Sequence, residues 1–192
     1  MIEPIKLRIN ESIDVKKGLL ENQTILDTID ALAHAITDCL RNGGKLALCG
    51  NGGSASDALH FAGEIVGRFQ KERKAWPAIV FNVDVATMTA IANDYGYDNV
   101  FARQVEGHLT KKDILIGIST SGNSENVLRA IQMAKNLGCR TAALLGKDGG
   151  KIGKVVDYPV IVPCHVTARV QESHIMIIHI LCEMIEASMV DE

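Results

Sequence analysis

The chain has 192 residues, the usual size of one domain, and this length buries enough surface to fold without disulfides or a structural metal. Hydrophobic residues make up 47% and charged residues 22%, which excludes a disordered chain. The net charge of −3 lacks the basic excess that binding to phosphate backbones requires. Nucleic acid is therefore not an expected partner.

The termini and cysteines favour a cytoplasmic protein. The five cysteines are odd in number and none are spaced as C-x-x-C, so we expect reduced thiols rather than disulfides or a zinc knuckle. The first ten residues contain no apolar signal segment. The most apolar late run, residues 175–181, is far shorter than the ~20 residues that span a bilayer, so no membrane partner is expected.

The first 43 residues predict two amphipathic helices. Ile5, Ile9 and Ile13 recur at helical spacing, and residues 25–40 carry a second apolar stripe. Residues 42–44, Asn-Gly-Gly, end the second helix. We interpret residues 1–43 as an N-terminal helical hairpin. Its apolar stripes need a partner, either the helices of the sheet or another subunit, and we favour an oligomeric interface.

Residues 44–192 alternate between short apolar runs and helical segments. The runs predict strands at residues 45–49, 78–81, 114–118, 141–145 and 160–162. Helices are expected at residues 54–67, in a stretch that ends near residue 93, at 126–137 and at 167–187. This alternation is typical of a parallel sheet covered on both faces. The sequence therefore predicts an α/β fold, a three-layer α/β/α sandwich with a five-stranded parallel sheet, which forms a single structural domain with the hairpin.

Ligands of such folds bind beyond the carboxyl ends of the strands. Asn51, Gly52 and Gly53 follow the first predicted strand, where glycines let the backbone approach a ligand and the next helix N-terminus attracts anions. A dinucleotide fingerprint and a P-loop are excluded, because G-x-G-x-x-G and G-K-[ST] are absent. A plain capped turn is the alternative interpretation of this loop.

The loop after the third predicted strand is rich in hydroxyl groups. Ser119, Thr120, Ser121 and Ser124 surround one glycine just before a helix. Hydroxyls and backbone N–H groups together can bind a phosphate monoester without a lysine. Helix capping accounts for one hydroxyl and not for four, so we expect a phosphate site here.

Two predicted helices carry potential metal ligands. His60 and Glu64 are four residues apart, and Gln171 and His179 are eight apart, so each pair shares one helix face. Together they form a plausible four-ligand site for a divalent metal. Glutamine is an uncommon zinc ligand, however, and a packed core histidine is the alternative for His179, which lies in an apolar run and needs a polar partner there.

Three further groups have weaker signals. Asn93 and Asp94 end a helical stretch, where an amide–acid pair often forms a turn but where Asp94 could also accept a sugar hydroxyl. Arg68 and Arg73 are candidates for the rim of an anion site. Residues 146–151 carry two lysines among glycines, and we interpret them as a solvated loop.

The loops at residues 50–54 and 119–124 resemble those of the sugar isomerase (SIS) domain, over about residues 30 to 187. More narrowly, five segments are similar to those of the phosphoheptose isomerases: CGNGGSASDALHFAGE, AIANDYGY, GISTSGNSENV, GKDGGK and ARVQESHIMIIH. The resemblance implies a cytoplasmic homotetramer with sites at subunit interfaces. It also implies conversion of D-sedoheptulose 7-phosphate to D-glycero-D-manno-heptose 7-phosphate, the first step of ADP-heptose biosynthesis for lipopolysaccharide and other surface glycans.

The resemblance also implies roles for individual residues. One zinc ion per subunit (Zn2+) is expected on His60, Glu64, Gln171 and His179. The residues implied in substrate binding are Asn51, Gly52, Gly53, Glu64, Asn93, Asp94, Ser119, Thr120, Ser121, Ser124 and Gln171. An aldose–ketose isomerisation also needs a base near C1 and C2 and an acid at the carbonyl oxygen. Our catalytic candidates are Glu64 as the base and His179 as the acid.

Two alternatives to this function are open. SIS domains also serve as non-catalytic phosphosugar-binding or protein-interaction modules, and one relative binds the bacterial replication initiator. That relative lacks the acid and the histidine that stand here at Glu64 and His179, and it has arginine in place of Ser121. The other alternative is an isomerase of a different ketose phosphate, such as a hexulose or pentulose phosphate.

Overall fold

The structure is a computed structural model that describes residues 2–190. Its strands are β1 (Leu46–Gly50), β2 (Ala78–Val80), β3 (Ile114–Ser119), β4 (Arg140–Gly146) and β5 (Tyr158–Val162). Its α-helices are α1 (Ile2–Leu20), α2 (Gln23–Arg41), α3 (Gly53–Val66), α4 (Val85–Tyr95), α5 (Val100–His108), α6 (Glu125–Asn136) and α7 (Thr167–Met189). Between residues 2 and 190, no helix is long and apolar enough to cross a membrane.

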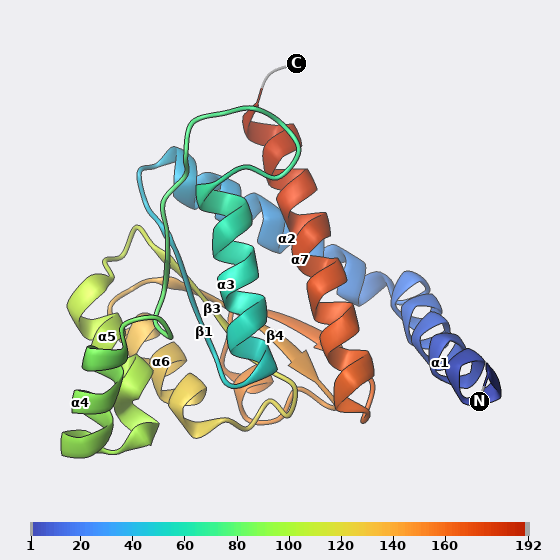
Figure 1. Ribbon diagram of the computed structural model, residues 1–192. Coiled ribbons are helices and arrows are strands. Elements are labelled where there is room, and N and C mark those ends of the chain that lie inside the picture. Colours follow the sequence, from blue (N-terminus) through green and yellow to red (C-terminus); the bar gives the residue numbers. More distant parts are fainter. Residues whose placement is uncertain (1, 191–192) are drawn as a thin grey trace.

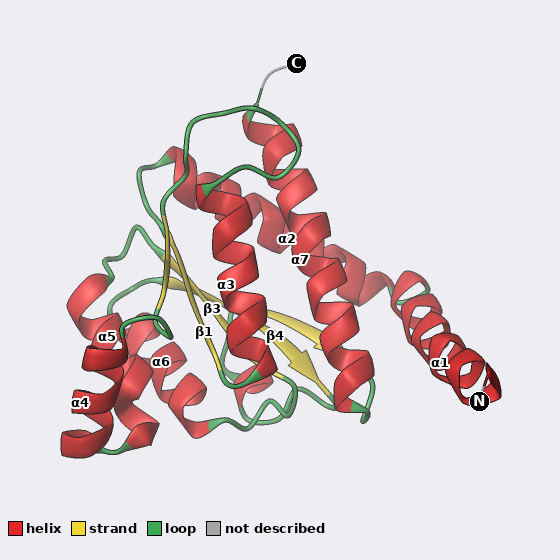
Figure 2. Ribbon diagram, in the orientation of Figure 1, coloured by secondary structure: helices red, strands yellow, loops and turns green. Residues whose placement is uncertain are grey.

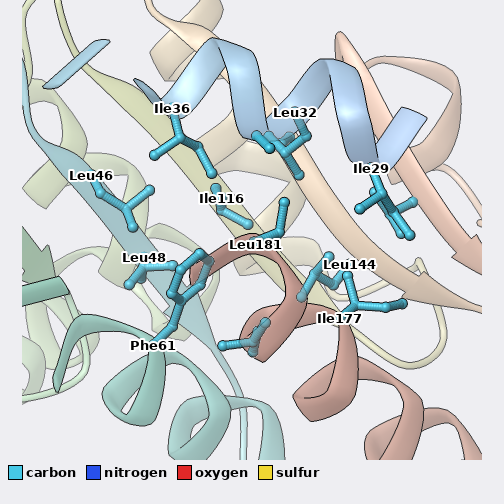
Figure 3. Close-up of a cluster of buried hydrophobic side chains, with 14 of the residues drawn as sticks. Ile29, Leu32, Ile36, Leu46, Leu48, Phe61, Ile116, Leu144, Ile177 and Leu181 are labelled. Atoms are coloured by element: carbon cyan, nitrogen blue, oxygen red, sulfur yellow. The ribbon is translucent and has the colours of Figure 1, made fainter. Parts of the chain in front are cut away.

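The five strands form one sheet in the order β2-β1-β3-β4-β5, and every neighbouring pair is parallel (Figure 2). Side chains alternate between its faces. Leu46 and Leu48 pack with α2, α3 and α7 in one core, part of which Figure 3 shows, whereas Ala47 and Cys49 pack with α5 and α6 in a second core. The predicted three-layer α/β/α sandwich is confirmed.

One helix lies where the sequence predicts no element, between residue 94 and the third strand. This helix is α5, which has only nine residues and would be marginal in isolation. It forms because Val100, Phe101 and Val105 are fully buried in the second core. The amide of Gln104, at the same buried side, donates to the carbonyl of Phe81 beyond the end of β2. Tertiary packing therefore stabilises a segment whose local signal is weak.

The two N-terminal helices are packed differently. α2 buries Ile29, Leu32 and Ile36 against the sheet, together with α7 (Figure 3). α1 extends away from the sheet and leaves Ile5 and Ile9 more than half exposed (Figure 1). The sheet layer thus provides the partner for the stripe of α2 but not for that of α1. An oligomerisation role for residues 1–43 stays a prediction.

One buried carboxylate holds the segment between α3 and β2. Glu186 accepts the backbone N–H groups of residues 69–71 and pairs with Nε of Arg73 at 2.9 Å. The guanidinium of Arg73 also stacks over Trp76. Burial alone would raise the pKa of Glu186, but these donors outweigh it and lower the pKa. Arg73 is therefore a structural residue, and its prediction as part of an anion rim is wrong.

Replacing Glu186 by glutamine is expected to lower the free energy of unfolding at pH 7 by about 3–5 kcal/mol, the usual cost of leaving a buried charge without its partner. Because the folded-state pKa of Glu186 is lowered, its stabilisation is present above the unfolded-state pKa and is lost as pH falls. The difference between wild type and variant should therefore shrink below about pH 4. Denaturant unfolding of both proteins, followed by circular dichroism at pH 7 and again below about pH 4, measures this difference in the free energy of unfolding.

The matched control is Glu183→Gln, which changes an exposed carboxylate one turn earlier on α7. Its effect on the free energy of unfolding should stay within about 0.5 kcal/mol. Equal stability of the Glu186 and Glu183 variants at pH 7 would contradict the role given to Glu186.

Candidate functional site

The centre of the sheet is a topological switch point. β2 lies on one side of β1, whereas β3, β4 and β5 follow on the other side. In open parallel sheets, ligands bind in the crevice outside the carboxyl ends of the strands at such a point. Residues 51–53 directly follow β1, and residues 120–124 directly follow β3. The two loops singled out from the sequence therefore lie side by side at this edge.

A reciprocal pair of carboxamides joins these two loops. Nδ2 of Asn51 donates to Oδ1 of Asn126 at 2.9 Å, and Nδ2 of Asn126 donates to Oδ1 of Asn51 at 3.0 Å. The hydroxyl of Tyr97 donates to the same oxygen of Asn51 at 3.1 Å. Sequence reasoning misses Asn126 and Tyr97. The one available signal is that Asn126 lies two residues after the run of hydroxyls.

The serine loop, residues 119–124, gathers its hydroxyl groups. Oγ of Ser119 lies 2.9 Å from Oγ of Ser124 and 3.5 Å from Oγ of Ser121. Gly122 has a φ of 65° and sits so close to the backbone of Gly149 that any Cβ would clash with it. The loop after β4 thus braces the serine loop. Ser124 directly precedes α6 and its side chain makes no capping hydrogen bond, so the hydroxyls gather beside a helix N-terminus, an arrangement that suits a phosphate group.

α3 and α7 run in the same direction over one face of the sheet (Figure 1). At their N-terminal ends Gly53 lies against Gln171, whose amide nitrogen leaves no room for a Cβ on Gly53. Two turns further along, Nε2 of His60 lies 3.4 Å from Nε2 of His179. Oε1 of Glu64 lies 3.0 Å from Nε2 of His60. The packing of the two helices therefore creates a cluster of three polar side chains.

This cluster is a candidate metal centre. His60, Glu64 and His179 each offer one ligand atom, and these atoms lie within 4.8 Å of one another. Two imidazole nitrogens and a carboxylate oxygen form a donor set that suits zinc. Gln171, the fourth expected ligand, is not brought to the cluster in this chain. It precedes His179 by eight residues, about 12 Å of helix, so its role as a ligand stays a prediction.

Two neighbours of the cluster have no predicted role. The ring of Phe69 stacks on His179, with ring centroids 5.6 Å apart. Asp57 lies one turn before His60 on α3, and its Oδ2 is buried without a hydrogen-bond partner among residues 2–190. Burial raises the pKa of Asp57, and the nearby His60 opposes that shift. The spacing of three residues from His60 is the signal that could have identified Asp57.

The remaining predicted substrate contacts lie near the C-terminal end of α4. Asn93 and Asp94 end α4 with exposed side chains, and Nδ2 of Asn93 donates to Oδ1 of Asp94 at 2.8 Å. They lie close in sequence to Tyr97, which reaches Asn51. His174 is fully buried, and its Nε2 lies 3.0 Å from the carbonyl oxygen of Leu145. Burial lowers the pKa of His174 to about 4, so it stays neutral.

The similarity to known proteins covers most of the chain. The SIS domain model matches residues 10–146. A phosphoheptose isomerase of Geotalea daltonii is 48% identical over 192 residues, 100% of this chain and 99% of that one. One of Nitratiruptor sp. is 53% identical over 182 residues, 91% of this chain and 97% of that one. The solved structure of a phosphoheptose isomerase from Neisseria gonorrhoeae superimposes with a TM-score of 0.91 at 40% identity, covering 96% of this chain and 98% of that one.

With the SIS loops at the switch point and similarity of this extent, the chain belongs to the SIS domain family and, within it, to the phosphoheptose isomerases.

Proposed function

We propose that the protein converts D-sedoheptulose 7-phosphate to D-glycero-D-manno-heptose 7-phosphate. The observation that carries this proposal is the similarity to phosphoheptose isomerases over the full length of the chain. The site supports it with two features that isomerisation of a sugar phosphate needs. These are a cluster of hydroxyls for the phosphate and a group of titratable side chains for proton transfer.

The phosphate would be bound by the serine loop. Ser119, Ser121 and Ser124 already have their hydroxyl oxygens within hydrogen-bond reach of one another. Each hydroxyl can rotate its proton toward an anion. Thr120 and the N–H groups at the start of α6 complete the donors, and backbone groups of Gly52 and Gly53 face the same crevice across the switch point. Asn51, Asn93 and Asp94 would contact the sugar.

Proton transfer would involve Glu64 and His179. The reaction removes a proton from C1 and protonates the C2 oxygen, which gives an enediol. A proton is then added to C2 while the C1 hydroxyl loses its proton, and this leaves an aldehyde at C1 and a hydroxyl at C2. Glu64 is the proposed base, and its hydrogen bond with His60 fixes the direction of its carboxylate. His179 is the proposed acid, and the ring of Phe69 against it restricts its orientation. Both side chains are half-buried, so substrate can reach them.

We also propose that His60, Glu64, Gln171 and His179 hold one zinc ion per subunit. An atom bound to the ion cannot transfer a proton, so Glu64 and His179 would act as base and acid only through atoms that do not ligate the ion. The donor set of the cluster fits this ion, which would polarise the carbonyl oxygen of the sugar when bound. Within one chain Gln171 is about two helical turns from the other three residues. Ligation of the ion by Gln171 therefore requires that two subunits together build the site. Contact of Gln171 with the substrate, beside Gly53, requires only one subunit.

The His60–Glu64–His179 cluster also bears on the alternative functions. A module that only binds a phosphosugar or another protein has no need for convergent proton-transfer groups, and this chain brings Glu64 and His179 together through His60. The observation favours an enzyme. By its family we place the reaction in the cytoplasm, at the first step of ADP-heptose biosynthesis, which supplies lipopolysaccharide.

Glu64→Gln and His179→Gln are each expected to lower kcat for sedoheptulose 7-phosphate by ~10²–10⁴-fold, the usual contribution of a positioned acid or base. Turnover can be followed by NMR of the heptose 7-phosphate product. His34→Gln, which changes an exposed histidine on α2, is the control and should keep normal turnover. Near-normal turnover of a folded Glu64→Gln protein would remove Glu64 as the base.

Protein purified without chelator is expected to contain one divalent ion per chain by elemental analysis. Removal of the ion should abolish turnover, because the carbonyl oxygen of the sugar then lacks its polarising group. Added zinc should restore turnover. Glu64→Gln and His60→Gln should lower the metal content as well. Metal-free protein with full activity would refute the metal proposal.

We further propose that the protein is a homotetramer in which residues 1–43 contribute to the interfaces. Ile2, Ile5, Ile9 and Ile13 on α1 are all exposed in the single chain, an unusual density of apolar side chains on one helix. The paired substitution Ile5→Asp and Ile9→Asp should therefore reduce the mass found by analytical ultracentrifugation. A monomeric wild-type chain would contradict the assembly.

A further inference from the structure

The orientation of the Asn51 carboxamide, meaning which side carries its oxygen and which its nitrogen, follows from a backbone N–H group that acts through Asn126. The N–H of Val127 donates to Oδ1 of Asn126 at 3.0 Å, and a backbone N–H can act only as a donor. Oδ1 of Asn126 is therefore the acceptor, and Nδ2 of Asn126 must face Asn51. Asn126 is only 3% exposed, so water does not compete for these groups.

This arrangement leaves one donor of Asn51 available. Oδ1 of Asn51 accepts from Nδ2 of Asn126, which can only donate and therefore fixes that atom as the oxygen. The hydroxyl of Tyr97 also donates to it. Nδ2 of Asn51 uses one N–H for Asn126. Its second N–H, on the far side of the amide from this bond, has no acceptor among the described residues. It belongs to the loop after β1, beside the serine loop at the switch point.

We propose that Asn126 is a positioning residue that makes Asn51 present an N–H, and not its carbonyl oxygen, to an oxygen of the sugar. The inference rests on the proposed function, and it assigns the sugar to Asn51 because the hydroxyls of the neighbouring loop already serve the phosphate. Without Asn126, only Tyr97 would restrain Asn51. The amide could then rotate and direct its oxygen toward the sugar, where a carbonyl oxygen, which only accepts, would repel it and lose its hydrogen bond.

The test is a double-mutant cycle on the full-length protein with Asn126→Leu, Asn51→Ala and the double variant. Asn126→Leu keeps the approximate volume of the side chain and removes its hydrogen bonds. Each single variant should lower kcat/KM for sedoheptulose 7-phosphate by about tenfold, the effect of one lost hydrogen bond. The double variant should be no worse than Asn51→Ala, because Asn126 acts through Asn51. Losses that multiply would overturn the proposal.

A second readout separates orientation of Asn51 from distortion of the serine loop. The inhibition constant of inorganic phosphate should stay within about twofold of wild type in Asn126→Leu, since the phosphate site does not use Asn51. A parallel weakening of phosphate inhibition would show a merely structural role and would overturn the proposal. If the leucine variant folds poorly, Asn126→Ser removes the amide and keeps a polar group at this buried position.

The same cycle is measured by calorimetric binding of sedoheptulose 7-phosphate, which requires no turnover. A wild-type chain that binds this compound without isomerising it would refute the proposed function, while the dissociation constants of the four proteins would still decide the role of Asn126. A wild-type chain that binds no sugar phosphate would refute both.

Discussion

The packing of α3 against α7 sets the register between these two helices, and the polar cluster depends on that register. Because the helices run in the same direction, Gly53 lies against Gln171 near their N-terminal ends and His60 lies opposite His179 two turns later. A side chain on Gly53 would displace the amide of Gln171, which lies at the flexible end of its side chain, so the packed apolar side chains of α3 and α7 and not this contact hold the helices together.

At the C-terminal ends of α3 and α7, a buried carboxylate links the two helices. Glu186, about two turns beyond His179, binds the backbone of the segment that follows α3. One of the N–H groups that it accepts is that of Phe69, whose ring lies against His179. A buried ion pair of this kind adds little net stability, because desolvation offsets its attraction. Its contribution here is geometric, since Glu186 holds the backbone of the residue whose ring, Phe69, lies beside the candidate metal centre.

Much of the fold and part of the site follow from the sequence. Strands such as residues 114–118 are uninterrupted apolar runs, and their burial on both faces requires that pattern. His60 and Glu64 can be paired from spacing alone, because one helix turn brings them together. The contact of His60 with His179 depends on the relative placement of two helices that are more than 100 residues apart, which no local pattern encodes.

Other features are missed for the same physical reason. The pairing of Asn51 with Asn126 spans two loops of the sheet edge, and α5 exists because a distant core buries it. In the linear sequence Arg73 has no evident partner and is therefore predicted to bind an anion. The carboxylate that neutralises it, that of Glu186, lies more than 100 residues later on α7. In each case a group satisfied by a remote partner cannot be distinguished from a free one until the chain is folded.

A chain with a net charge of −3 can still bind a dianion at this site, because neutral donors supply the attraction. The serine hydroxyls lie together just before α6, whose N-terminus carries partial positive charge. The nearest acid in sequence is Glu125, in the first turn of α6, and Arg129 one turn later binds its carboxylate at 2.9 Å. That pairing offsets the charge of Glu125 beside the loop. The positive field of the helix end thereby remains available to the proposed phosphate site, which then needs no lysine that would have to be desolvated.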